Sequence, residues 1–150
     1  MAIYKNDIVL IAGSGDFAFE AANFLFDKNR LNHIILLSKN YKITKSFKNN
    51  VSNYDVRDLE KLILFIKKRI IYKVLIIGYV QLPPISEIKL SLTSKIILSK
   101  NFFFNDINNQ SKILKKFIES KKLKLLSQKN IFPRNLLVPT VPYYYRGLGI

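Results

Sequence analysis

The chain has 150 residues and a mass of 17.5 kDa, the size of a single domain, and 49% of its residues are hydrophobic, enough to build a packed core. This composition excludes disorder as the default state. Lysine and arginine number 25 against 10 aspartate and glutamate residues, a net charge of +15. Most of this excess is lysine in a chain also rich in Ile and Asn, so it indicates anionic partners only weakly, and we do not expect nucleic acid on charge alone.

The chain has no cysteine and one histidine, His33. Disulfides, thiolate nucleophiles, cysteine metal sites and His-rich zinc sites are therefore excluded. We expect His33 to be a surface or edge residue, because the sequence shows no second ligand beside it. The N-terminus lacks a signal-like pattern, and no apolar run reaches the roughly 18 residues of a membrane span. We therefore expect a soluble, cytoplasmic chain.

The first elements are a strand, a helix and a second strand. Ile8 to Ala12 (IVLIA) is a continuous apolar run closed by Gly13, typical of a strand buried on both faces. Apolar residues at three and four residue intervals predict a helix from Asp16 to Asn29. We expect Asp16 to be its capping acid, and a metal-binding or catalytic carboxylate is the alternative. Ile34 to Leu37 (IILL) predicts the second buried strand.

A second helix and a third strand follow. Asp55 is placed to cap the helix, whose expected core face is Leu59, Leu62, Ile63, Ile66 and Ile70. Val74 to Ile77 (VLII), closed by Gly78, predicts the third strand. A further amphipathic helix is expected from about Asp106 to Lys121, before a short strand at Lys124 to Leu126.

This alternation of strands and helices predicts an α/β fold, a Rossmann-like doubly wound parallel sheet in three αβα layers. In such a sheet the first and third predicted strands lie beside the central crevice. We therefore expect Ile8–Ala12 and Val74–Ile77 to be close neighbours.

Residues 13–18 (GSGDFA) fit the pattern G-x-G-x-x-A between a strand and a helix. Glycines permit a tight turn and a close approach of backbone amides to a phosphate, and the helix dipole favours an anion. A turn that binds nothing is the alternative. Dinucleotide sites also need an acid at the end of the second strand, where this chain has Leu37-Ser38-Lys39-Asn40, so we do not expect an NAD-dependent dehydrogenase.

Three segments resemble the N-terminal half of the UDP-2,3-diacylglucosamine diphosphatases of the LpxI type. Residues 8–15 (IVLIAGSG) are similar to the family's opening LIAGxG. Residues 74–88 (VLIIGYVQLPPISEI) are similar to its segment vvxaGxVxRPpLsdL, and residues 135–139 (NLLVP) to its dLLap stretch. The chain departs from the family at Phe17-Ala18, where Leu-Pro is usual, and at Gln81-Leu82, where basic residues are usual.

The resemblance implies a domain at 1–139, a tail or linker start at 140–150, and a catalytic C-terminal domain that these residues do not include. It implies water attack on the pyrophosphate of UDP-2,3-diacylglucosamine, releasing UMP and 2,3-diacylglucosamine 1-phosphate, with magnesium as cofactor. Implied partners are this substrate or its lipid product, a separate C-terminal half, and contact with the inner face of the inner membrane. The candidate substrate-binding residues are Gly13, Ser14, Gly15, Gly78 and Gln81.

We assign no catalytic and no metal-ligating residue in this chain, because no cluster of carboxylates is visible. The chain is thus expected to be the substrate-binding half of a lipid A enzyme, inactive alone. The alternative is a small Rossmann-like binding module whose basic face contacts nucleic acid or an acidic partner.

Overall fold

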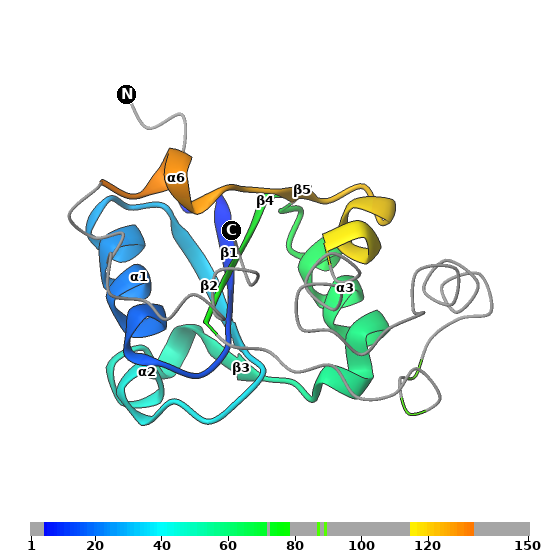
Figure 1. The fold of residues 1–150 in the computed structure, drawn as a ribbon, viewed down its shortest axis with the longest axis horizontal. Helices are drawn as coiled ribbons and strands as arrows, with labels where there is room; N and C mark the ends of the chain where they lie inside the picture. Colours follow the sequence, from blue (N-terminus) through cyan, green and yellow to red (C-terminus); the bar gives the residue numbers. More distant parts are fainter. Residues whose placement is uncertain (1–4, 72, 79–86, 88, 90–114, 134–150) are drawn as a thin grey trace.

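The computed structural model describes residues 5–71, 73–78, 87, 89 and 115–133 (Figure 1). In this part of the chain the strands and helices follow the order expected for a doubly wound domain. They are β1 (Ile8–Ala12), α1 (Asp16–Asp27), β2 (Leu31–Leu36), α2 (Tyr41–Ser46), the 3-10 turn η1 (Lys48–Asn50), β3 (Val51–Asn53), the 3-10 turn η2 (Val56–Asp58), α3 (Leu59–Lys68), β4 (Lys73–Ile77), β5 (Lys124–Leu125) and α6 (Gln128–Ile131).

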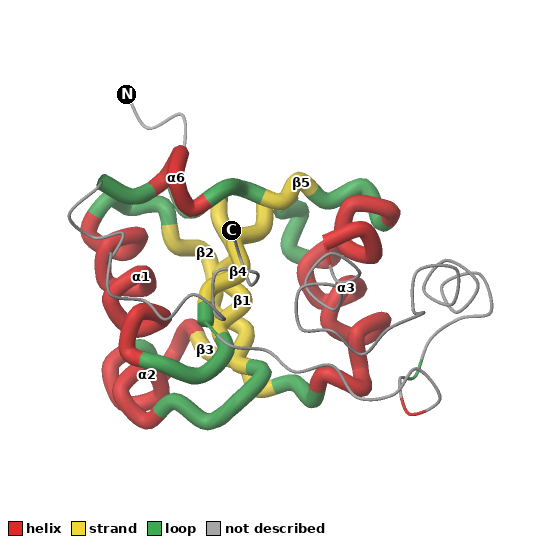
Figure 2. The backbone as a smooth tube through the Cα atoms, in the orientation of Figure 1, coloured by secondary structure: helices red, strands yellow, loops and turns green. Residues whose placement is uncertain are grey.

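The strands form one parallel sheet in the order β3-β2-β1-β4-β5. Helices α1 and α2 lie on one side of it and α3 on the other (Figure 2). The predicted three-layer Rossmann-like fold is therefore confirmed. The first and third predicted strands are direct neighbours, since β1 pairs with β4 from Ile8 opposite Lys73 to Ala12 opposite Ile77.

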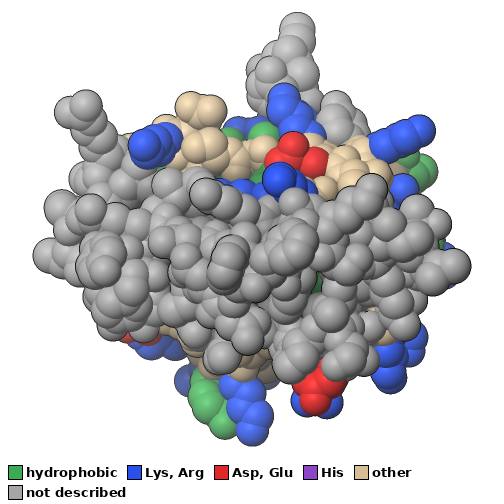
Figure 3. Space-filling model, turned by 45° about the vertical axis from the view of Figure 1, so that its right-hand side comes forward, with side chains coloured by type: hydrophobic (Ala, Val, Ile, Leu, Met, Phe, Trp, Pro, Cys, Tyr) green, Lys and Arg blue, Asp and Glu red, His purple; other side chains and the backbone are tan. Residues whose placement is uncertain are grey.

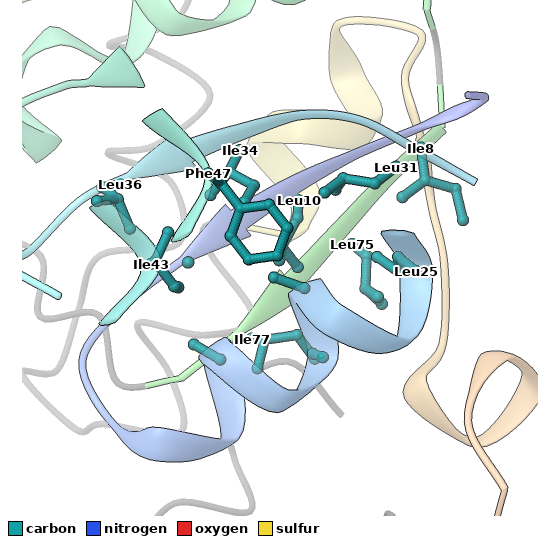
Figure 4. Packing of buried hydrophobic residues seen from close by; sticks show 14 of the residues in the cluster. Ile8, Leu10, Leu25, Leu31, Ile34, Leu36, Ile43, Phe47, Leu75 and Ile77 are labelled. Atoms are coloured by element: carbon teal, nitrogen blue, oxygen red, sulfur yellow. The ribbon is translucent and has the colours of Figure 1, made fainter. Parts of the chain in front are cut away.

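Alternate residues of each central strand point into two separate hydrophobic cores. In β1, Val9 and Ile11 belong to the core under α3, whereas Ile8, Leu10 and Ala12 belong to the core under α1 and α2. Figure 4 shows this second core, in which side chains from β1, β2 and β4 meet Leu25 of α1 and Ile43 of α2. Because both faces are covered, β1 is apolar throughout and β4 is apolar from Val74 to Ile77, as the continuous runs in the sequence predict.

The core face of α3 follows the predicted periodicity with one exception. Leu59, Leu62, Ile63 and Ile66 of α3 are buried, but Ile70 is 90% exposed. The core assignment of Ile70 is wrong because α3 ends at Lys68 and Ile70 then takes a left-handed backbone conformation, with φ of 59°. Contrary to the prediction, Asp55 does not cap α3, because the 3-10 turn η2 lies between them and Asp58 is the N-cap residue of α3. The Asp55 carboxylate caps η2 instead, where it accepts a hydrogen bond from the Arg57 amide at 2.8 Å.

Other boundaries differ from the sequence-based expectations. Strand β2 runs from Leu31 to Leu36, and the predicted helix from Asp16 ends at Asp27. Within the predicted helix from Asp106 to Lys121, residues 115–120 are helical and bury Phe117 and Ile118, while residues 106–114 lie outside the described part. Helix α2 and strand β3 were not predicted.

The amino ends of three strands are joined by one carboxylate. Asp7 accepts hydrogen bonds from Arg30, at 3.2 and 3.0 Å, and from Lys73, at 3.1 Å, and its side chain is 16% exposed. Burial alone would raise the pKa of Asp7, but the hydrogen bonds from Arg30 and Lys73 outweigh it and hold this pKa below 3.8. Asp7 therefore ties the starts of β1, β2 and β4 together.

We expect Asp7→Asn to lower the free energy of unfolding by about 2 kcal/mol at neutral pH, since it removes charge-assisted bonds to two partly buried cations. Asp27→Asn, on the exposed surface of α1, should change it by less than about 0.5 kcal/mol. Urea unfolding measures both. The lowered pKa of Asp7 stabilises the folded state above the unfolded pKa, so the Asp7→Asn difference should shrink as the pH falls through the folded pKa. A pH-independent difference would contradict this account.

A candidate anion-binding turn at the carboxyl ends of β1 and β4

The glycine turn begins as a continuation of the sheet. Buried Gly13 donates its amide hydrogen to the Ile77 carbonyl oxygen at 2.8 Å, which extends the pairing of β1 with β4 by one bond. The Gly13 amide is therefore already used inside the protein. Among the predicted site residues, Gly13 sets the position of the turn, and the atoms available to a ligand lie further along it.

Gly78 lies against this turn. Its φ is 93°, and a Cβ at this position would lie 2.7 Å from the Ser14 carbonyl oxygen and 3.1 Å from the Gly13 carbonyl carbon. No side chain fits there, because real Cβ atoms do not approach backbone so closely. The structure thus brings Gly13, Ser14 and Gly78 together, as predicted, and the glycine at 78 is needed for packing between the two strand ends.

Gly15 has the open position in the turn. Its φ is 112°, a conformation that L-residues rarely adopt, and no atom of the described residues lies within 4 Å of where a Cβ would be. Ser14 and Gly15 are both exposed, and Gly15 is the N-cap residue of α1 with no side chain to cap the helix. The first amides of α1 consequently lack helical partners, and the positive end of the helix dipole faces this open space.

Asp16 does not have its predicted role. It is the first residue of α1, makes no capping hydrogen bond, and forms an exposed ion pair with Lys42 at 3.3 Å. The prediction of a capping acid is wrong because the helix starts at Asp16 itself, one residue earlier than a cap at this position would require, and Gly15 is the N-cap residue. The carboxylate instead lies beside the open turn and contributes a negative charge there.

The segment after β2 contributes a contact that the sequence analysis missed. Asn40 donates from Nδ2 to the Gly15 carbonyl oxygen at 3.3 Å, and its Oδ1 accepts from the Ile43 amide at 3.2 Å, so one side chain caps α2 and holds the turn. Asparagine before a short polar helix is a typical N-cap signal. Nearby in the chain, the Ser38 hydroxyl oxygen is buried and has no hydrogen-bond partner within the described residues.

His33 lies away from this turn and is not a surface residue. It is 6% exposed, its Nε2 lies 2.8 Å from the Ser52 Oγ, and its ring packs on Phe65. The expectation of a surface or edge position is wrong because β3, which was not predicted, pairs with β2 and covers it. Burial, and secondarily the positive charge of Arg69, lowers the pKa of His33 from 6.5 to about 4.

The predicted residue Gln81 lies outside the described residues. Within the described ranges, no three His, Asp or Glu side chains lie close enough together to hold a metal ion. The carboxylate nearest the turn in the chain, Asp16, is exposed and paired with a lysine. The donor set of this part of the chain therefore does not fit magnesium, and we derive no chemical step through it.

The fold and the turn define a class: a Rossmann-like α/β domain with a strand, a glycine turn and a helix N-terminus at the carboxyl edge of a parallel sheet. The family described as the LpxI N-terminal domain matches residues 7–135, and the chain belongs to this family, which is associated with lipid A biosynthesis. No curated protein and no solved structure matches the chain significantly. In the described part of the chain, no helix is both long and apolar enough to cross a membrane.

The contrast between the two glycines is testable. We expect Gly78→Ala to lower the free energy of unfolding by about 3 kcal/mol, because it combines backbone strain with a clash against Ser14. Gly15→Ala meets no atom and should lose only the strain, about 1 to 2 kcal/mol. Chemical denaturation of both variants measures the difference. Equal losses for the two variants would show that the contact between Gly78 and Ser14 contributes nothing to the free energy of unfolding.

His33 is the chain's single histidine, so its imidazole resonances can be followed by NMR without ambiguity. We expect them to titrate near pH 4 in the folded protein. Because this pKa lies below that of the unfolded chain, the folded state loses stability as the pH falls from 6.5 toward 4, by about 3 kcal/mol. The His33→Gln variant should lack this component in urea unfolding. A folded-state pKa at or above 6 would refute the proposed burial.

Proposed function

We propose that this chain binds UDP-2,3-diacylglucosamine as the N-terminal half of a lipid A pyrophosphohydrolase, with the diphosphate at the open turn of Ser14 and Gly15. The observation that carries the proposal is the empty space over Gly15 at the exposed start of α1. Family membership supports the pathway, and the turn supports a phosphate-bearing ligand.

The surroundings of the turn favour an anion. The first amides of α1 and its dipole contribute roughly 0.3 to 1 kcal/mol per anionic group. The segment after β2 offers the exposed Lys39, and has no carboxylate in the place where dinucleotide enzymes hold a ribose. Phosphate oxygens would then face backbone amides and a lysine, and a nicotinamide dinucleotide would lack its ribose contact.

The proposed reaction is attack of water on the pyrophosphate, which releases UMP and 2,3-diacylglucosamine 1-phosphate. In this scheme the described residues bind and orient the phosphates. The base that activates water belongs to the second half of the enzyme, because no cluster of carboxylates lies at the described turn. The substrate would be held between the two halves.

Two matched charge variants test the position of the phosphates. Asp16→Asn removes a negative charge beside the turn and should tighten UMP and UDP-N-acetylglucosamine binding about threefold. Asp27→Asn removes the same charge at the other end of α1 and should leave affinity unchanged. NMR titration measures affinity and should show the largest shifts at the amides of Ser14, Gly15 and Asp16. Equal effects of the two variants, or shifts elsewhere, would refute the assignment.

We also expect this 150-residue chain alone to release no UMP from UDP-2,3-diacylglucosamine above background, with or without magnesium. The reason is the lack of a carboxylate cluster at the turn, within the residues that the structure describes. The assay is chromatographic detection of UMP with purified chain. Steady release of UMP in proportion to protein concentration would contradict the proposal that the catalytic base belongs to the second half of the enzyme.

A further inference from the structure

Charge is divided unequally between the first helix and the segment that follows β2. Helix α1 carries three exposed acids, Asp16, Glu20 and Asp27, and no lysine or arginine. From residue 31 to residue 54 the chain has no acid and four lysines. These lysines, Lys39, Lys42, Lys45 and Lys48, are all exposed.

The four lysines and Tyr41 form what we call the α2 patch. Helix α2 buries only Ile43, and Tyr41 in its first turn is 78% exposed. Lys42 pairs with Asp16, whereas the side chains of Lys39, Lys45 and Lys48 have no ion pair or hydrogen bond to any described residue. Three cations and a large aromatic side chain therefore stand in solvent without compensation.

The α2 patch adjoins the candidate turn. Asn40, between Lys39 and Tyr41, donates to the Gly15 carbonyl oxygen, and Lys42 reaches Asp16 at the start of α1. In Figure 1, α2 lies at the end of the domain where β1 and β4 finish. Figure 3 shows hydrophobic side chains and Lys or Arg side chains protruding at this lower edge, with acidic side chains there too. A partner surface bound at the α2 patch would therefore lie next to the open turn.

We propose that the α2 patch docks the domain onto an anionic lipid bilayer, with the carboxyl edge of the sheet toward the membrane. This inference rests on the proposed function, because a substrate with two acyl chains must be taken from a bilayer. Lysines near an anionic leaflet each raise membrane partitioning roughly fivefold, and a tyrosine ring is well suited to the headgroup region. Asp27, at the opposite end of α1, would be repelled from the same leaflet and help to fix the orientation.

A bilayer accounts for this surface better than a nucleic acid does. A membrane needs only a group of cations and an amphipathic side chain on one convex edge. Single-stranded nucleic acid is usually held in a basic groove with several stacking rings, and the described α2 patch offers one exposed ring on a short helix. Nucleic acid is therefore an outcome that the experiment must be able to detect.

The test compares two double variants with equal changes in charge. Lys45→Gln with Lys48→Gln removes two cations from the α2 patch, and Lys67→Gln with Lys68→Gln removes two exposed cations from the last turn of α3. Partitioning onto vesicles of phosphatidylcholine with 30 mol% phosphatidylglycerol (roughly the anionic fraction that attracts basic segments) is measured by sedimentation. We expect about a 25-fold loss for the α2 pair and less than threefold for the α3 pair.

Further measurements separate the possible failures. Tyr41→Ser should weaken vesicle binding severalfold without changing the slope of binding against salt, because the charge is unchanged. UMP titration of the α2 pair should match the unmodified chain, so failure of nucleotide binding alone would refute the proposed function and leave vesicle binding measurable. Equal losses for the two lysine pairs would overturn the docking surface. So would binding of single-stranded RNA that depends on the α2 pair, in the absence of vesicle binding.

Discussion

The close approach of Gly78 to the Gly13-Ser14 backbone is the constraint on which the rest of the site depends. The hydrogen bond from Gly13 to Ile77 extends the pairing of β1 with β4, and the next residue of β4 must then pass where any Cβ would meet the Ser14 carbonyl oxygen. This contact restricts the path of the backbone between the end of β1 and the start of α1, which begins two residues after Ser14. Gly78 and Asn40 both contact the backbone of the turn, and neither occupies the space over Gly15.

Most of the fold could be predicted because the central strands are buried on both faces. A strand with helices on either side must be apolar at every position, so the runs at residues 8–12 and 74–77 read as strands without help from the rest of the chain. Strand β3 does not follow this pattern. It has three residues, Val51, Ser52 and Asn53, none of them fully buried, and it exists through its pairing with β2. Missing it also misplaced His33, since the neighbour that covers the imidazole was unknown.

The candidate site was predictable in its backbone and less so in its side chains. Glycine at three positions near strand ends is a local signal for tight turns, and the structure brings those turns together. The role of Asp16 could not be read in the same way. Whether an acid caps a helix or begins it depends on where the turn places the first helical residue, which here follows from the contact between Gly78 and Ser14.

The hydrogen bond from Asn40 to Gly15 joins two segments 25 residues apart, and a local sequence pattern does not predict such a contact.

The two ends of the sheet differ in how their charges are satisfied. At the amino end, Asp7 forms ion pairs with both Arg30 and Lys73 inside a partly buried cluster, so the cations there stabilise the fold. At the carboxyl end, the start of α1 and the lysines of α2 have only Asp16 as a described partner, and this pair is exposed to solvent. Surface ion pairs of this kind contribute little to stability. The positive potential at the carboxyl end is thus largely free to act on external anions, with a phosphate proposed at the start of α1 and a bilayer at the lysines of α2.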